Sequence, residues 1–175
     1  MACPPGVIRP SMDRMRISLF SILGDLSGCS FLDLFSGSGV LGIEAASRGA
    51  EPVVLVEKDL RKRDTILKNI SFVESKVELF SMPVERFLRS DVRSFDVVFL
   101  DPPFDLAGKA SFLDGLAEGR TLAEEGLAIL HLHRSEAGKI QSAGLSLVDR
   151  REYGQSILLF FKRKAGDATA GVSIP

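Results

Sequence analysis

Short apolar runs that recur between helical patterns constrain the fold of this chain more than any other feature. Val53–Val56 is a continuous run of mostly β-branched residues, and 97–100 is another apolar run. Such runs are typical of strands buried on both faces of a parallel sheet. Between them, apolar residues recur at helical spacing, as in segment 59–72. The sequence therefore predicts an α/β chain with helices on both faces of a mostly parallel sheet.

The end of the chain predicts a pair of antiparallel strands. Segments 145–152 and 156–162 are strand-like and are joined by a short turn around Gly154, and so short a link can only make an antiparallel pair. The run 157–161 is apolar at every position, so we expect this last strand inside the sheet rather than at its edge. Before this pair we expect a strand at 127–133 and a helix at 135–143.

A glycine-rich loop after the first predicted strand is the first candidate site. Segment 37–42, Gly-Ser-Gly-Val-Leu-Gly, matches the G-x-G-x-x-G dinucleotide-binding pattern, and Glu57 follows Gly37 by 20 residues. Asp33 precedes the loop, where its charge would repel a pyrophosphate but favour the sulfonium and ammonium groups of S-adenosylmethionine. We therefore expect S-adenosylmethionine, with Glu57 accepting hydrogen bonds from its ribose hydroxyls. A nicotinamide or flavin cofactor is the alternative.

The second candidate site is the tetrapeptide Asp101-Pro102-Pro103-Phe104, which directly follows a predicted buried strand. Two prolines make this loop rigid and extended, so it can aim polar groups. The carboxylate of Asp101 and the carbonyl of Pro102 can hold the two hydrogens of an exocyclic amine, which turns the nitrogen lone pair out of conjugation. Phe104 can stack on a nucleobase. The chemistry needs positioning, with no metal and no covalent nucleophile.

With these motifs, the chain resembles the bacterial 16S ribosomal RNA guanine-N2 methyltransferases that carry a D-P-P-F motif. The resemblance extends over nearly the whole chain up to Lys164, and five segments carry it: 9–16, 31–50, 56–57, 101–104 and 154–155. It implies a doubly wound, Rossmann-like class I methyltransferase with an antiparallel final strand in a mostly parallel sheet. It also implies methyl transfer to N2 of a guanine in small-subunit rRNA, either free or in the assembling subunit.

The resemblance implies roles for three groups of residues. Asp101, Pro102, Pro103 and Phe104 would hold the base, and Arg9, Arg14 and Arg16 would border the RNA entrance. The adenine would lie near the start of a helix expected from Val84, where Pro83 stands in place of an acid or amide, so the backbone of Val84 is expected to meet the ring. The residues expected to hold the cofactor are Asp33, Phe35, Ser36, Gly37, Ser38, Gly39, Glu57 and Val84.

Composition limits the other functions that this chain could have. A net charge of −1 argues against non-specific binding of nucleic acid through bulk charge, so any RNA must be recognised by a local basic patch. The two cysteines offer neither a disulfide framework nor a metal-ligand spacing. We see no apolar run long enough to span a bilayer and no secretion signal. We therefore expect a cytoplasmic, monomeric protein that is not bound to a membrane.

The length of 175 residues suits one domain. We expect the methyltransferase domain at 1–164, with a basic segment and a helix at 1–28, and a flexible tail at 165–175. His131 and His133 are interpreted as polar positions that alternate with leucines along a strand. Three alternatives stay open: an amino-methyltransferase that acts on DNA or protein, an NAD-dependent oxidoreductase, and an inactive cofactor-binding RNA module.

Overall fold

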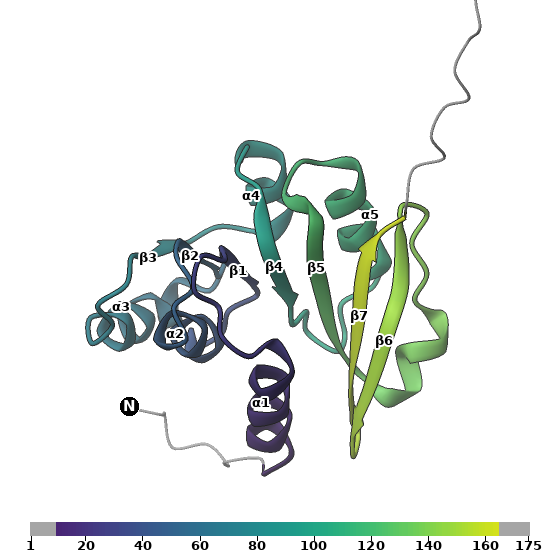
Figure 1. Ribbon diagram of the computed structural model, residues 1–175, viewed down its shortest axis with the longest axis horizontal. Coiled ribbons are helices and arrows are strands. Elements are labelled where there is room, and N and C mark those ends of the chain that lie inside the picture. Colours follow the sequence, from purple (N-terminus) through teal and green to yellow (C-terminus); the bar gives the residue numbers. More distant parts are fainter. Residues whose placement is uncertain (1–9, 165–175) are drawn as a thin grey trace, which may run out of the picture.

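The computed structural model describes residues 10–164, which form one seven-stranded sheet with helices on both faces (Figure 1). The strands are β1 (Phe31–Leu34), β2 (Val53–Val56), β3 (Val77–Phe80), β4 (Phe95–Leu100), β5 (Leu122–His133), β6 (Leu145–Tyr153) and β7 (Ser156–Arg163). The helices are α1 (Pro10–Leu23), α2 (Val40–Ser47), α3 (Arg63–Ile70), α4 (Val84–Ser90) and α5 (Ala110–Glu118), with 3-10 helices η1 (Leu60–Lys62) and η2 (Arg134–Lys139).

The strand order across the sheet is β3-β2-β1-β4-β5-β7-β6. All neighbouring pairs from β3 to β5 are parallel, and β7 is antiparallel to both β5 and β6. The predicted doubly wound sheet with an antiparallel final strand inside it is therefore confirmed. The chain leaves β1 towards β2 on one side and returns to β4 on the other, so the order reverses at β1. Open α/β sheets bind ligands at such a reversal, beyond the carboxyl ends of the strands.

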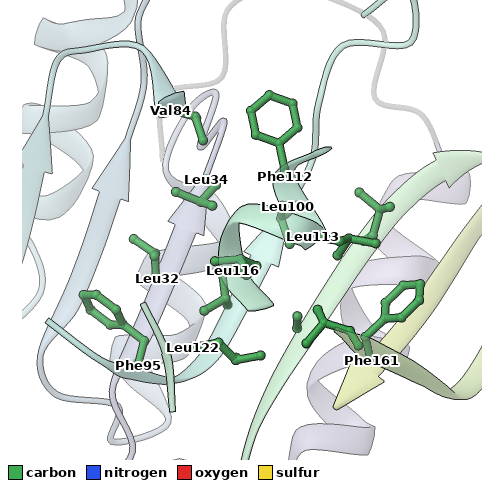
Figure 2. Close-up of a cluster of buried hydrophobic side chains, with 14 of the residues drawn as sticks. Leu32, Leu34, Val84, Phe95, Leu100, Phe112, Leu113, Leu116, Leu122 and Phe161 are labelled. Atoms are coloured by element: carbon green, nitrogen blue, oxygen red, sulfur yellow. The ribbon is translucent and has the colours of Figure 1, made fainter. Parts of the chain in front are cut away.

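The two faces of the sheet are covered by different helices. α4 and α5 cover one face, where Val84, Leu113 and Leu116 pack in one apolar cluster with Leu32 and other residues of the strands (Figure 2). α1, α2 and α3 cover the other face, with a second apolar cluster. Successive residues of a strand contribute to opposite clusters, so the continuous apolar runs of β2 and of residues 97–100 in β4 are required to bury both faces.

Glycine at position 42 lets α2 pack directly on β2. A Cβ atom at Gly42 would lie 2.2 Å from a methyl group of Leu55, far inside van der Waals contact. This close approach draws the amino end of α2 towards the sheet. The loop before α2 is therefore held tightly over the carboxyl ends of β1 and β2.

Three predicted elements differ from the structure. Instead of a helix at 135–143, the chain forms the short η2, which ends at Lys139. β5 begins at Leu122 rather than at residue 127, because its first residue pairs with Phe95 of β4. The helix predicted at 59–72 is divided into η1 and α3 and ends at Ile70. The tail expected at 165–175 lies outside the described residues.

Within residues 10–164, no helix is long and apolar enough to cross a membrane.

Candidate active site

Four strands of the sheet bring four residues to one level near its carboxyl edge. The pairing aligns Leu34 of β1 with Val56 of β2 and Leu100 of β4, and Leu100 with Leu130 of β5. The next residues along these strands therefore lie at one level, beside the point where the strand order reverses. These four residues are Phe35, Glu57, Asp101 and His131.

A cavity of about 460 Å³ opens at this level. It lies between the glycine loop, the segment that follows β2 and the loop that follows β4. Its volume is within the range of small-molecule binding sites. The lining residues are Phe35, Gly37, Glu57, Lys58, Asp59, Lys62, Asp101, Pro102, Pro103, Phe104 and His131.

The loop between β1 and α2 has an unusual backbone conformation. Phe35 has a φ of 65°, the only positive φ of a non-glycine residue among the described residues. Gly37 and Gly39 have φ values of 58° and 78°. A left-handed conformation at a bulky residue is strained and is found mostly at functional sites, where surrounding contacts hold it. The ring of Phe35 packs edge-on against Phe112 of α5, with 5.2 Å between centroids, which holds this conformation.

Glu57 connects the loop to the end of β2. One carboxylate oxygen, Oε2, accepts a hydrogen bond from the Gly37 amide at 2.9 Å, and the other, Oε1, accepts one from the Asp59 amide at 2.9 Å. Lys62 donates to Oε2 at 3.2 Å. A carboxylate has about four acceptor sites, so one site on Oε1 stays free, and a second hydroxyl group in the cavity could bond to Oε2 by replacing Lys62.

Asp33 lies beneath the glycine loop and does not line the cavity. Its side chain is 1% exposed, and neither of its oxygens makes a well-formed hydrogen bond within the described residues; the same is true of the hydroxyl of Ser36. Burial raises the pKa of Asp33 well above its ordinary value, and the charges of Asp101 and Glu57 add to this effect. Unsatisfied polar atoms in a buried loop suit a ligand that brings positive charge and hydrogen-bond donors.

Asp101 is paired with a histidine to which the sequence analysis assigned no function. Its Oδ1 lies 2.7 Å from Nδ1 of His131, which is 1% exposed. Phe104 is half exposed, and its ring packs edge-on against His131 and His133, with 6.1 Å between centroids in both cases. Buried Lys109 donates a hydrogen bond to the carbonyl of Phe104 at 2.8 Å. Hydrogen bonds therefore hold both ends of the D-P-P-F segment, at Asp101 and at Phe104.

Helix α1 is anchored at the same edge of the sheet as the cavity. The hydroxyl groups of Ser18 and Tyr153 lie 2.6 Å apart, and Tyr153 pairs with Ser156, which in turn pairs with His133 near the end of β5. Arg14 and Arg16 are on this helix, and Arg16 lies 3.4 Å from Asp13. Arg9 lies outside the described residues.

The structure brings most of the predicted site residues together, but not all of them. Phe35, Gly37, Glu57 and the D-P-P-F residues line the cavity, whereas Asp33, Ser36, Ser38, Gly39 and Val84 are not among its described lining residues. The side chain of Val84 packs in the apolar cluster under α4 and α5. His131 and Lys62 also line the cavity, although no local sequence pattern identified them as site residues. His131 could have been found from its position on β5, which is level with Asp101, but that position is known only once the register between β4 and β5 is known.

No group of three or more histidine, cysteine or acidic side chains within residues 10–164 could hold a metal ion.

The strand order, the glycine loop joined to Glu57, and the D-P-P-F cavity define a class I methyltransferase that depends on S-adenosylmethionine. The chain belongs to the family described as Conserved hypothetical protein 95, whose model matches residues 1–162. It is 29% identical to the Escherichia coli protein named Ribosomal RNA small subunit methyltransferase D, over 92% of this chain and 82% of that protein.

Two further comparisons agree with this assignment. The chain is 31% identical to a Bacillus subtilis protein named "Putative rRNA methyltransferase YlbH", over 89% of this chain and 88% of the relative. Its structure resembles that of a protein described as "Putative methyltransferase yhhF from Escherichia coli", with a TM-score of 0.82 and 30% identity over 94% of this chain and 92% of that one.

Proposed function

We propose that this methyltransferase modifies the exocyclic N2 amine of a guanine in small-subunit ribosomal RNA. The observation that carries the proposal is the placement of Asp101, which lines the same cavity as Pro102 and Glu57. The names of the Escherichia coli and Bacillus subtilis relatives support RNA as the substrate. The free rRNA and the assembling subunit are both candidate forms of it.

The residues of the chain fit S-adenosylmethionine. Glu57 would hold the ribose hydroxyls, the loop from Phe35 to Gly39 would hold the methionine part, and the acids Glu57 and Asp101 that line the cavity suit a cation. When bound, the cofactor supplies a methyl group on a positively charged sulfur. This sulfur is a good leaving group because it becomes a neutral thioether when the methyl group is transferred.

The D-P-P-F loop would then act on the amine. Asp101 accepts one amine hydrogen through the oxygen not used by His131, and the Pro102 carbonyl accepts the other. Both bonds strengthen as the nitrogen becomes tetrahedral, so they stabilise the transition state more than the bound substrate. The Asp101 carboxylate would also be able to take the proton that the amine loses when the new bond forms. Phe104 would stack on the base.

Helix α1 supports an RNA surface beside the cavity. It carries Arg14 and Arg16 at the edge of the sheet where the D-P-P-F loop lies, and Arg9 precedes it in the sequence. Guanidinium groups pair well with phosphates. A patch of this kind would position the RNA although the net charge is only −1.

Transfer of radiolabelled methyl groups to unmodified 16S rRNA tests the proposal, with free rRNA, reconstituted small-subunit particles and duplex DNA as parallel substrates. We expect labelled N2-methylguanine in the rRNA of at least one of the two RNA samples. Label confined to DNA, or label on another base or atom, would overturn the proposal.

A further inference from the structure

The His131–Asp101 pair joins the start of the D-P-P-F loop to strand β5. His131 is almost completely buried, yet the only hydrogen bond of its side chain within the described residues joins Nδ1 to Oδ1 of Asp101, at 2.7 Å; Nε2 has no partner there. Burying a polar ring is costly unless it makes hydrogen bonds. Because this buried ring makes one hydrogen bond, to the D-P-P-F loop, we infer that the bond has a function.

Three carboxyl groups crowd this edge of the sheet, and each is accommodated differently. Asp33 is buried without a well-formed hydrogen bond, and its pKa is raised. Glu57 is held by two backbone amides and Lys62. Within the described residues, the carboxylate of Asp101 has one hydrogen-bond partner, Nδ1 of His131. Without that donor, an ionised Asp101 would face two other acids with no bond to orient it.

The chemistry of the pair determines which atom carries the hydrogen. An ionised carboxylate only accepts hydrogen bonds, so Nδ1 of His131 must be the donor. A neutral imidazole then carries its one hydrogen on Nδ1 and leaves Nε2 as a bare acceptor. This is consistent with the unpartnered Nε2, because an unsatisfied buried acceptor is more easily tolerated than an unsatisfied buried N–H.

We propose that His131 is a positioning residue: its Nδ1–H holds Oδ1 of Asp101 and leaves Oδ2 to accept a hydrogen of the substrate amine. The inference rests on the proposed function for its substrate. The register of β4 and β5 makes the arrangement rigid, because Leu100 pairs with Leu130 and the two residues of the pair follow directly. His131 does not contact the amine itself; it acts through Asp101.

Two substitutions at position 131 separate the bond from the packing. His131→Leu fills the site with an apolar side chain but removes the donor, and we expect the turnover number to fall about 10- to 100-fold, the size of effect seen when the partner that orients a metal ligand is removed. His131→Asn places an amide N–H close to the position of Nδ1, and we expect it to recover most of that loss. The affinity for S-adenosylhomocysteine should change less than twofold in both variants. Thr121→Val is the control, because it makes another buried polar side chain apolar at the opposite edge of the sheet.

A double-mutant cycle distinguishes positioning from a general loss of structure. If His131 acts through Asp101, adding His131→Leu to Asp101→Ala should cost nothing further in turnover. Full additivity of the two losses would overturn the proposal. So would an unchanged turnover number in His131→Leu, or equal losses in the leucine and asparagine variants.

Nitrogen NMR of His131 gives a readout that is independent of activity. We expect the hydrogen on Nδ1 in the wild type and a change of the Nδ1 signal in Asp101→Ala. A hydrogen found on Nε2 alone would overturn the proposal, because a bare Nδ1 cannot donate to a carboxylate. Failure of the wild type to methylate any rRNA sample would instead contradict the proposed function, and the NMR result would still decide the pairing.

Discussion

Gly37 and Glu57 are 20 residues apart in sequence and are joined by a hydrogen bond of 2.9 Å from the glycine amide to Oε2 of the glutamate. The bond ties the glycine loop after β1 to the end of β2. It fixes a carboxylate at the edge of the cavity, with the Asp59 amide holding its other oxygen. The acid proposed to meet the ribose therefore also shapes the loop proposed to meet the rest of the cofactor.

Glu57→Gln should weaken S-adenosylhomocysteine binding about 10- to 100-fold, as expected when a hydrogen bond to a charged group is removed. Both carboxylate oxygens accept from backbone amides, so the NH₂ group of glutamine would have to face one of these donors. Titration calorimetry measures the effect. Glu44→Gln, which alters a glutamate paired with Arg48 on α2, is the control. Equal affinities for the Glu57 variant and the wild type would contradict this role.

Asp101→Ala should lower the turnover number about 100-fold or more, the size of effect seen when one positioned polar group at a reacting centre is removed. The affinity for S-adenosylhomocysteine should barely change, because Glu57 and the glycine loop remain. Single-turnover methylation of the rRNA substrate separates the two quantities. Asp105→Ala, in the same loop but outside the cavity lining, should behave as the wild type. Near-normal turnover in Asp101→Ala would mean that the active site lies elsewhere.

Phe104→Ala should weaken substrate binding by about 1–3 kcal/mol if the ring stacks on the target base. The half-exposed ring contributes little to the core, so the melting temperature should change only slightly. Phe104→Trp keeps an aromatic face and should retain affinity. An alanine variant that loses turnover at saturating RNA but keeps its affinity would point to a structural role for Phe104 instead.

Replacing Arg9, Arg14 and Arg16 together with glutamine should raise the Michaelis constant for RNA. It should also reduce the slope of log affinity against log salt concentration by about 0.7–0.9 for each phosphate that is no longer neutralised by an arginine. Filter binding over a range of salt concentrations measures the slope. Arg89→Gln on α4, which covers the other face of the sheet, is the control. An unchanged slope in the triple variant would show that these arginines only solvate the helix or pair locally.

Asp33→Asn should stabilise the protein at neutral pH. The pKa of Asp33 is raised above its ordinary value of 3.8 by burial, so above that pH the folded protein holds a proton that the unfolded chain has released. The free energy of unfolding of the wild type therefore falls as the pH rises from 3.8 towards the raised pKa. Asparagine removes this dependence. Urea unfolding between about pH 4 and 8 tests it, with the exposed Asp64→Asn as control. Identical pH slopes for the wild type and Asp33→Asn would contradict the prediction.

Local patterns in the sequence were enough to predict the class of fold and most of the cavity. Continuous apolar runs identify strands buried on both faces, and the glycine loop and the D-P-P-F loop follow two of these strands directly. In a parallel sheet all carboxyl ends lie at one edge, so residues after the strands meet there whatever the details of packing. Glu57 and Asp101 could be assigned to one site for this reason.

Only the tertiary structure decided what each side chain faces. His131 looked like one of two alternating polar residues, and its bond to Asp101 depends on the register between β4 and β5, which no local pattern specifies. Asp33 proved to be buried beneath the loop rather than exposed to the cavity, with the backbone of Gly42 on α2 close to its carboxyl group. Sequence determines which residues stand at the end of each strand. The packing of helices and the pairing of strands determine which of them meet, since both depend on contacts between segments far apart in the chain.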